Sequence, residues 1–364
     1  MTRPVSYQPC PKLPTEFALM VACCRWSYST QGAEGIRALA NKVDWGKFLS
    51  ACRRHRVQGL AWHALDALDV ILPAPVQVAF AGDARAIAGQ GLRAAGESAR
   101  LADAFDASGV PLLFLKGLTL GKLAYGNPFL KMGWDVDVLV RPTDVVAAAR
   151  LLAKLGYELQ MPRDSNLLAR WHATHNQSVW LLDEGLYVEL HNRTTDLPQM
   201  LPTIGAWSPR QTVTIAPGID LPTLADDELF AYLCVHGGWS AWFRLKWITD
   251  LAALLHRRSI GEIEALYDRS QLLGAGRTAA QALLLAAKFY DIPLTDRLAD
   301  RLNTPLNHWL VQAAIRRMLG GEPTERPLGT LPIHLTHFLL KDGIGYKLAE
   351  LRRKIRAATG RFSP

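Results

Sequence analysis

Along the first hundred positions, hydrophobic residues recur at mixed spacings of three and four, a pattern typical of amphipathic helices. The stretch "WGKFLSACRRHRVQGLAWHALDAL", residues 45–68, shows this spacing clearly. An Ala-rich stretch follows and ends at Ser108-Gly109, residue types that are frequent at helix C-termini. We therefore expect residues 1–108 to form a helical region.

The pattern changes at residues 109–222, where short apolar or β-branched runs alternate with helical stretches. The segment "WDVDVLV", residues 134–140, alternates strictly and predicts a strand. The expected order is a strand at 110–116, a helix at 118–126, a strand at 134–140, a helix at 142–156, and two strands at 176–183 and 186–192. This order predicts a small mixed β-sheet with helices.

From residue 223 onward the spacing is helical again. Asp226 or Asp227 is expected to cap a helix that ends near His236, because Gly237-Gly238 follow. More helices are expected after it, and residues 345–364 read as a basic amphipathic helix. The predicted fold class is α+β, with a sheet-containing core at 109–222 between helical regions at 1–108 and 223–364.

Composition predicts a globular chain with a large core, since 49% of the residues are hydrophobic and 20% are charged. The 5 cysteines include no CxxC pair, so neither a disulfide framework nor a zinc site is indicated. The net charge of +8 favours a polyanionic partner such as a nucleotide, RNA or a membrane surface. No apolar run approaches the roughly 20 residues of a membrane span, and no secretory signal is evident, so we expect a cytoplasmic protein.

Asp135 and Asp137 need compensation, because a carboxylate on a half-buried strand is costly. Side chains alternate across a strand, so both acids share one face while the valines between and after them take the other. A divalent cation would offset their repulsion, and oxygen ligands suit Mg²⁺ or Mn²⁺. In "YVELHN", Glu189 and His191 share a face, which makes Glu189 the candidate third carboxylate.

Lys116-Gly117 lies where the first expected strand gives way to a helix. Glycine lets backbone N–H groups approach a phosphate, a helix N-terminus favours negative charge, and the lysine adds a cation. Seen alone, this dipeptide is equally typical of an ordinary strand-to-helix turn. Followed by the two aspartates, it predicts half of a metal–nucleotide site.

The order of Lys116-Gly117, a helix, "AYG", "DVDVLV" and "VELHN" resembles an uncharacterised bacterial nucleotidyltransferase family of the polymerase-β-like superfamily. The resemblance extends to the segment around His55 and to "LCVHGGWSAWFRLKWITDLAALL", residues 233–255. It implies transfer of a nucleoside monophosphate from an NTP such as ATP to an unidentified acceptor hydroxyl, with pyrophosphate release. The acceptor class stays open: a small molecule, a peptide, a protein or RNA.

The resemblance also assigns residues to roles. It implies that Asp135, Asp137 and Glu189 are catalytic metal ligands and that Lys116 and Gly117 hold the phosphates. Three positions depart from the family pattern: Lys131 replaces a usual arginine, Trp134 directly precedes Asp135, and the third acid is Glu rather than Asp. These departures leave open an alternative, a non-catalytic nucleotide- or partner-binding module with the same fold.

Residues on the later helices have two interpretations. Arg244 either reaches the nucleotide phosphates or pairs with an acid, and Trp242 and Trp247 either pack near the base or belong to the core. His191, on the strand at 186–192, is a candidate for supporting the metal ligands, and His236 is either another such candidate or an interior histidine whose hydrogen bonds are satisfied. Lys246 and Asp250 are spaced for a surface ion pair.

Other histidines and basic residues are weaker candidates. His172 and His175 are interpreted as a loop feature, because no further ligand is near in the sequence. Residues 52–56 and 352–356 form two basic clusters, which are the places to look first for RNA binding. A nucleic-acid-binding helical protein is the third and weakest hypothesis, since it rests on charge alone.

Overall fold

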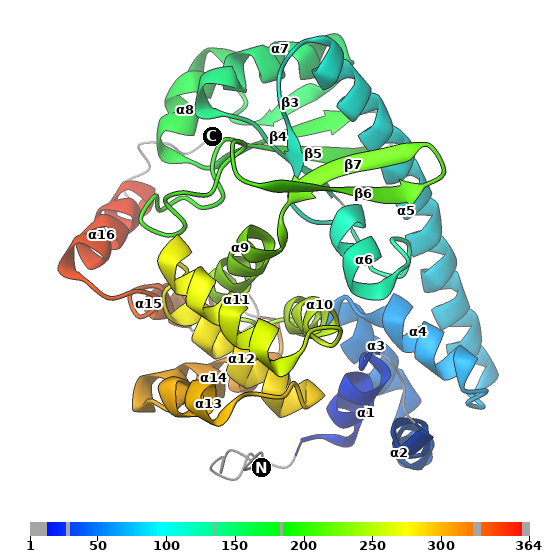
Figure 1. The fold of residues 1–364 in the computed structure, drawn as a ribbon. Helices are drawn as coiled ribbons and strands as arrows, with labels where there is room; N and C mark the ends of the chain where they lie inside the picture. Colours follow the sequence, from blue (N-terminus) through cyan, green and yellow to red (C-terminus); the bar gives the residue numbers. More distant parts are fainter. Residues whose placement is uncertain (1–12, 27–29, 134, 183–184, 323–328, 359–364) are drawn as a thin grey trace.

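The structure is a computed structural model that describes residues 13–26, 30–133, 135–182, 185–322 and 329–358. A sheet with covering helices forms one part of the molecule, and a larger assembly of helices forms the other (Figure 1). The predicted α+β fold class is confirmed. Trp134 and the turn at residues 183–184 lie outside the described residues.

The main sheet has five strands in the order β1-β2-β5-β4-β3. β2 and β5 run parallel, whereas the other neighbouring pairs are antiparallel. Its strands are β1 (Leu113–Phe114), β2 (Asp135–Leu139), β3 (Glu158–Met161), β4 (Gln177–Leu182) and β5 (Leu186–His191). The four expected strands are present, and β3 is an addition that the sequence interpretation did not include.

A second, two-stranded sheet was also not predicted. β6 (Arg210–Ala216) and β7 (Ile219–Leu224) form an antiparallel hairpin around Gly218, which has a φ of +77°. The hydroxyl of Thr223 donates a hydrogen bond of 2.6 Å to the carbonyl of Phe114, so the hairpin is attached to β1. The hairpin thereby extends the sheet region up to the start of the C-terminal helices.

Helix α5 (Ala74–Ala107) joins the two parts of the molecule. Its 34 residues correspond to a length of about 50 Å. Phe80 in its first half belongs to the core of the helical part, whereas Leu101 and Phe105 in its second half pack under the sheet. The helix ends before Ser108-Gly109, as predicted.

The remaining helices surround these elements. α6 (Leu118–Tyr125), α7 (Val145–Lys154) and α8 (Leu168–Thr174) belong to the sheet region. The first helices are α1 (Thr15–Cys23), α2 (Thr30–Ala40), α3 (Trp45–His55) and α4 (Gln58–Ala67). The last are α9 (Asp226–Trp239), α10 (Leu245–Leu255), α11 (Ile260–Leu273), α12 (Arg277–Tyr290), α13 (Asp296–Leu302), α14 (Pro305–Leu319), α15 (Leu331–His337) and α16 (Ile344–Ala358).

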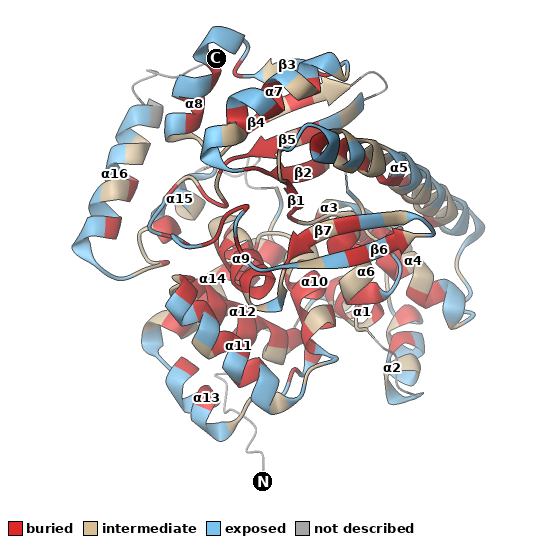
Figure 2. Ribbon diagram, turned by 45° about the horizontal axis from the view of Figure 1, so that its top comes forward, coloured by how far each residue is buried: buried red, intermediate tan, exposed pale blue. Residues whose placement is uncertain are grey.

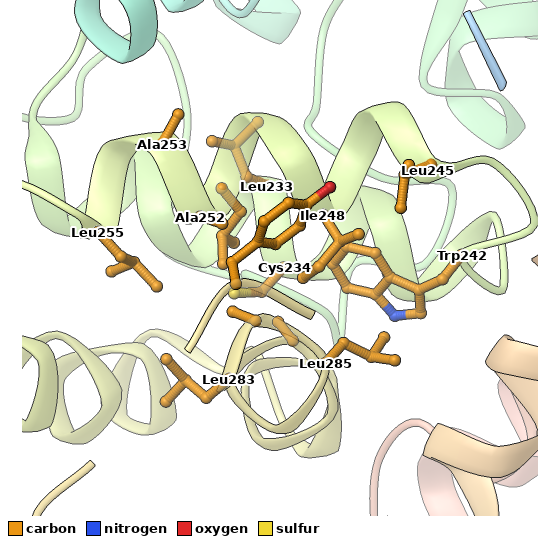
Figure 3. Packing of buried hydrophobic residues seen from close by; sticks show 14 of the residues in the cluster. Leu233, Cys234, Trp242, Leu245, Ile248, Ala252, Ala253, Leu255, Leu283 and Leu285 are labelled. Carbon is orange, nitrogen blue, oxygen red and sulfur yellow. The ribbon is translucent and has the colours of Figure 1, made fainter. Parts of the chain in front are cut away.

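One hydrophobic core includes residues from both the first and the last helices. Phe17 and Phe48 from the first helices and Leu251 and Leu283 from the last belong to the same buried cluster. Figure 2 shows buried residues concentrated on α9, α10 and α12, and Figure 3 shows the packing around Trp242 between them. Within the described residues, no helix is both long enough and apolar enough to cross a membrane.

Helix α9 corrects two expectations. It begins at Asp226 with Ala225 as its N-cap, so neither aspartate caps it through a side chain; Asp226 and Asp227 instead lie in its first turn. The helix also does not end at His236 but continues through Gly237-Gly238 to Trp239. The reason is close packing: a Cβ on Gly237 would lie 2.3 Å from the ring of Trp242.

Candidate functional site

The adjacency of β2 and β5 brings the predicted acids together. In the parallel register, Asp137 is opposite Glu189, and Asp135 is opposite Tyr187. The other side of the sheet faces the core that α5 and α7 cover. Val136 and Val138 of β2 and Val188 and Leu190 of β5 pack there. The expected division of the strand, with acids on one face and valines in the core, is confirmed by this burial.

A backbone hydrogen bond holds the segment with Lys116-Gly117 against β2, the strand that carries Asp135 and Asp137. The N–H of Leu115 donates to the carbonyl of Asp137 over 3.1 Å, which extends the pairing of β1 with β2. Gly117 has φ +75° and ψ −121°, a conformation that residues with side chains rarely adopt. α6 begins directly after it, so the free N–H groups of this helix terminus lie beside β2.

The Lys116 ammonium is bonded to the aspartates. It forms a hydrogen-bonded ion pair with Asp137 and lies 3.5 Å from Oδ2 of Asp135. On the other side, Nε2 of His191 lies 3.1 Å from Oδ1 of Asp137 and 3.5 Å from Oε2 of Glu189. Both oxygens of the fully buried Asp137 side chain therefore have a partner.

A second grouping of these atoms has the character of a metal site. One ligand atom each from Asp137, Glu189 and His191 all lie within 4.8 Å of one another. Two carboxylates and an imidazole form a donor set that divalent cations accept, and the oxygens suit Mg²⁺ or Mn²⁺. Asp135 lies outside this group and is connected to it through Lys116. These residues therefore fit a cation. His191 was expected only to support the metal ligands, but its ring nitrogen lies among the candidate ligand atoms themselves.

Burial and charge act in opposite directions on these groups. Burial lowers the pKa of His191, but the hydrogen bonds and charges of Asp137 and Glu189 raise it to about 9. Burial raises the pKa of Glu189, but His191 and Lys116 lower it to about 2. Burial also lowers the pKa of Lys116, and Asp137 and Asp135 raise it well above its ordinary value. Lys116 and His191 thus supply positive charge to the carboxylates.

A cavity of about 350 Å³ adjoins the carboxylates. One wall is a single face of α9, whose residues recur at helical spacing. That wall comprises Tyr232, Val235, His236, Trp239 and Ser240. Opposite residues include Asp137, Glu189 and His191. Further lining comes from Trp171 of α8, His175 and Asn176 of the following loop and Gln177 at the start of β4.

Aromatic contacts hold the ends of this cavity in place. The ring of Trp171 stacks on that of His175 with centroids 3.6 Å apart. The ring of Trp239 stacks on that of His337 at 4.0 Å, and the Arg353 guanidinium lies 4.8 Å from the same tryptophan ring. The sequence interpretation treated His175 as a loop feature and Arg353 as part of a basic cluster, and it missed Trp171, Trp239 and His337. For Trp239 the helical spacing after Tyr232 was the available signal, but helix α9 is apolar on several faces and hides it.

His172 is buried and His236 is partly buried, and both have depressed pKa values. Burial and the nearby Lys116 lower the pKa of His236 to about 3, so it faces the cavity as a neutral imidazole. His172 lies in α8 and is within 3.0 Å of the hydroxyl of Ser178. The interpretation of His172 as a loop feature is therefore wrong, because the helix forms where the sequence gave no clear periodicity.

Lys131 and Asp250 form a buried ion pair. The Lys131 ammonium lies 2.9 Å from Oδ2 of Asp250, and the hydroxyl of Tyr125 donates to the other oxygen over 2.8 Å. Only 4% of the Asp250 surface is exposed. The expected surface pair between Lys246 and Asp250 is wrong, since Asp250 points inward and its bonds go to residues before β2.

The structure shows the surroundings of Arg244 and Trp242. Arg244 precedes α10, and its Nη2 lies 3.5 Å from Oε2 of Glu322. This pairing agrees with the second interpretation of Arg244, while contact with phosphates stays a prediction. Trp242 is fully buried and donates a 3.0 Å hydrogen bond to Gln281, which confirms it as a core residue.

The fold and this site define a class. An α+β protein with a glycine-led helix start, paired aspartates on one strand and a glutamate on the neighbouring parallel strand is organised like an enzyme that transfers phosphorus-containing groups. The chain belongs to a family described as uncharacterised nucleotidyltransferase, whose sequence model matches residues 41–291. Among curated proteins, no sequence matches this chain. The matched span includes the acid strands, Lys116-Gly117, α9 and α10.

Proposed function

We propose that this protein transfers a nucleoside monophosphate from an NTP to an acceptor hydroxyl and releases pyrophosphate. The observation that carries the proposal is the gathering of Asp137, Glu189 and His191 within 4.8 Å, beside Lys116-Gly117, in a member of a nucleotidyltransferase family. Nucleotidyl transfer needs a cation site next to a phosphate site, and these two features supply candidates for both.

In this proposal, Asp135, Asp137 and Glu189 hold divalent cations, with Mg²⁺ or Mn²⁺ as the expected metal. When bound, the cations would neutralise charge on the carboxylates and on the phosphates. His191 bonds to Asp137 and Glu189 and so orients both carboxylates. His236, on the opposite wall of the cavity, contributes a neutral imidazole near the reacting groups.

The phosphates would lie against Lys116 and the backbone at Gly117, with Lys131 and Arg244 as further cations. Lys116 forms its ion pair with Asp137 in the structure, so cation binding to the aspartates would release its ammonium for a phosphate oxygen. The acceptor oxygen then attacks the α-phosphorus, the bond to the bridging oxygen breaks, and the hydroxyl proton is released. Catalysis by this chain would consist mainly of positioning and charge stabilisation.

A non-catalytic nucleotide- or partner-binding module is the second candidate. The observation in its favour is the direct Lys116–Asp137 ion pair, which neutralises one of the two strand aspartates without a cation. The two candidates agree on nucleotide binding and differ in whether a covalent product forms.

Incubation with α-labelled NTPs, Mg²⁺ and cell extract distinguishes them. We expect label in a product with the unmutated protein and a loss of about 100-fold or more with Asp135→Asn/Asp137→Asn. The matched control is Asp103→Asn/Asp106→Asn, two exposed acids on α5, which should transfer label normally. Nucleotide binding without transfer in every extract supports the module, whereas the absence of both transfer and Mg²⁺-dependent binding contradicts both candidates.

A further inference from the structure

Three chain segments far apart in the sequence converge beside Lys131. Nδ1 of His55, at the end of α3, accepts a 2.9 Å hydrogen bond from the backbone N–H of Leu245 at the start of α10. Gln58, at the start of α4, contacts Met132 over 3.4 Å through its amide nitrogen. Through these contacts, the neighbours of His55 and Leu245 are brought to the loop that leads into β2.

Two of those neighbours are cations, Arg56 and Lys246. Arg56 is close enough to Asp135 to be attracted by its charge and close enough to Arg244 to be repelled. Lys246 is repelled by the charges of Lys131, Lys116 and Arg56. Both side chains are partly buried. The positive charges of the first helices, the sheet region and the last helices therefore meet at one place, adjacent to the strand that carries the acids.

The other cations at this place have acidic partners, whereas the described residues include no ion-pair partner for the side chains of Arg56 and Lys246. Lys116 pairs with Asp137, Lys131 with Asp250, and Arg244 with Glu322. Throughout the described part of the chain, no hydrogen bond or ion pair is found for the Arg56 guanidinium or the Lys246 ammonium. The Lys246 ammonium lies 5.7 Å from the centroid of the Trp247 ring.

Such an arrangement is unfavourable unless an anion joins it. Partly buried cations that repel one another lower the stability of the folded protein, and Asp250 for Lys246 and Asp135 and Glu322 for Arg56 offset this only in part. Burial, Lys131 and Lys116 lower the pKa of Lys246 to about 7, which reflects the same cost. Arg56 in addition has a φ of +56°, a left-handed conformation that is uncommon for residues other than glycine.

We propose that Arg56 and Lys246 bind the β- and γ-phosphates of a nucleoside triphosphate. The proposal rests on the proposed function, because the triphosphate is assigned to this place by the neighbouring Lys116-Gly117 turn and acids. It goes further in naming one residue from the first helices, one from the last helices and a ligand chemistry, a compact polyphosphate. A site of two partly buried cations suits a compact polyphosphate ligand better than it suits an RNA backbone, because an extended RNA backbone needs an exposed cationic surface.

Binding of inorganic tripolyphosphate and of AMP, each in the presence of Mg²⁺, tests the proposal by isothermal titration calorimetry. Arg56→Gln and Lys246→Met should each weaken tripolyphosphate binding about tenfold or more, the effect of losing a charge-assisted hydrogen bond. AMP binding should change less than about threefold, because AMP has no β- or γ-phosphate. Lys47→Met, an exposed cation on α3, is the matched control and should leave both affinities unchanged.

Thermal unfolding separates a binding defect from a folding defect. Without ligand, Lys246→Met should unfold at an equal or higher temperature than the unmutated protein, because it removes an unpaired, partly buried charge. Unchanged tripolyphosphate affinity in both variants overturns the proposal, as does an equal loss for AMP and tripolyphosphate. Loss of RNA oligonucleotide binding with tripolyphosphate binding intact also overturns it and favours RNA as the ligand.

Experimental results distinguish a failure of this proposal from a failure of the proposed function. If no extract yields a labelled product but both variants lose tripolyphosphate affinity, the phosphate site stands and the transferase assignment fails. If label transfer occurs and both variants keep the KM for ATP of the unmutated protein, the transferase stands and the roles of Arg56 and Lys246 are wrong.

Discussion

Asp250 connects the loop before β2 to α10 through two buried bonds. One oxygen pairs with Lys131 and the other accepts from Tyr125. Asp250→Asn keeps the shape but leaves Lys131 without a counter-charge, so we expect the free energy of unfolding to fall by about 3 kcal/mol in urea denaturation. Asp268→Asn, which removes an exposed partner of Arg301, should cost less than about 1 kcal/mol. Equal effects would contradict the role of the buried pair.

Lys246 predicts a pH dependence of stability. Burial, together with Lys131, Lys116 and Arg56, lowers its pKa in the folded protein to about 7, against an ordinary value of 10.5, and Asp250 offsets this only in part. Between these values the unfolded chain binds more protons, so this residue makes stability rise with pH across that window. Below about pH 7 its full destabilising effect is present, on the order of a few kcal/mol.

Comparison with Lys246→Met isolates this contribution from all other titrating groups. The variant should be more stable than the unmutated protein at and below pH 7, and its advantage should disappear as the pH approaches 10.5. Urea denaturation at several pH values measures the difference. Lys347→Met, at an exposed position of α16, should show no such trend. A pH-independent difference for Lys246→Met would exclude an unpaired, partly buried ammonium.

Glu189 is the residue with which cation binding can be tested most cleanly. Glu189→Gln removes one carboxylate and leaves the bonds from Lys116 and His191 to Asp137 in place. We expect Mn²⁺ affinity, measured by electron paramagnetic resonance of free Mn²⁺, to fall about tenfold or more. Glu158→Gln, an exposed position on β3, is the control. If both variants bind Mn²⁺ equally well, the cation is held elsewhere.

The sequence was informative about single residues where a local rule applied. Strand alternation placed Asp135 and Asp137 on one face, and the parallel pairing of β2 with β5 put Glu189 beside them. Arg56 and Lys246 could not be predicted in the same way, because they come together only where the end of α3 contacts the start of α10. Their neighbours in the sequence are basic or apolar, which locally reads as a solvated helix face.

Among the elements, α9 shows why a helix can contain two glycines. The ring of Trp242 lies where a side chain of Gly237 would be, with 2.3 Å from the ring to an ideal Cβ. Gly237→Ala should therefore lower the free energy of unfolding by about 2 kcal/mol or more despite the better helix propensity of alanine. Gly261→Ala on α11, where nothing lies within 4 Å, should raise it by up to about 1 kcal/mol.

Chemical denaturation of both variants tests this directly. Stabilisation by Gly237→Ala would show that Trp242 can move without cost, and the close approach would then not explain the glycine. The same comparison explains a sequence-level error: Gly237-Gly238 resembled a helix end, but their cause is tertiary packing. The β6–β7 hairpin was also missed: its strands pair with each other and are attached to the main sheet through Phe114 of β1, a contact that the local sequence does not indicate.

For the whole molecule, the first and last helices interlock. The rings of Phe17 and Phe289 lie 5.8 Å apart, and Arg54 donates to the carbonyl of Met318 over 2.7 Å. The three regions expected from the sequence therefore differ in secondary structure, but the first and the third of them share one buried hydrophobic cluster. Residues so far apart along the chain should unfold together if their contacts contribute most of the stability.

Hydrogen exchange measures this coupling. Phe17→Ala should lower the free energy of opening by about 3 kcal/mol, because it creates a cavity in the shared core. The decrease should be the same for backbone amides of α3 and of α12, although only α3 belongs to the first helices. Val78→Ala, at an exposed position of α5, should leave both unchanged.

The pattern of loss decides between two organisations of the chain. If α12 keeps its full protection while α3 loses it, the first helices form an independent unit, and the site between Arg56 and Lys246 would depend on how that unit docks. Equal loss in both means that one cooperative core fixes the two cations relative to the acids. Adding Mg²⁺ and ATP should then raise the protection of α3 and α12 together, since a ligand bound by Arg56, at the end of α3, and Lys246, in α10, stabilises the core that α3 and α12 share.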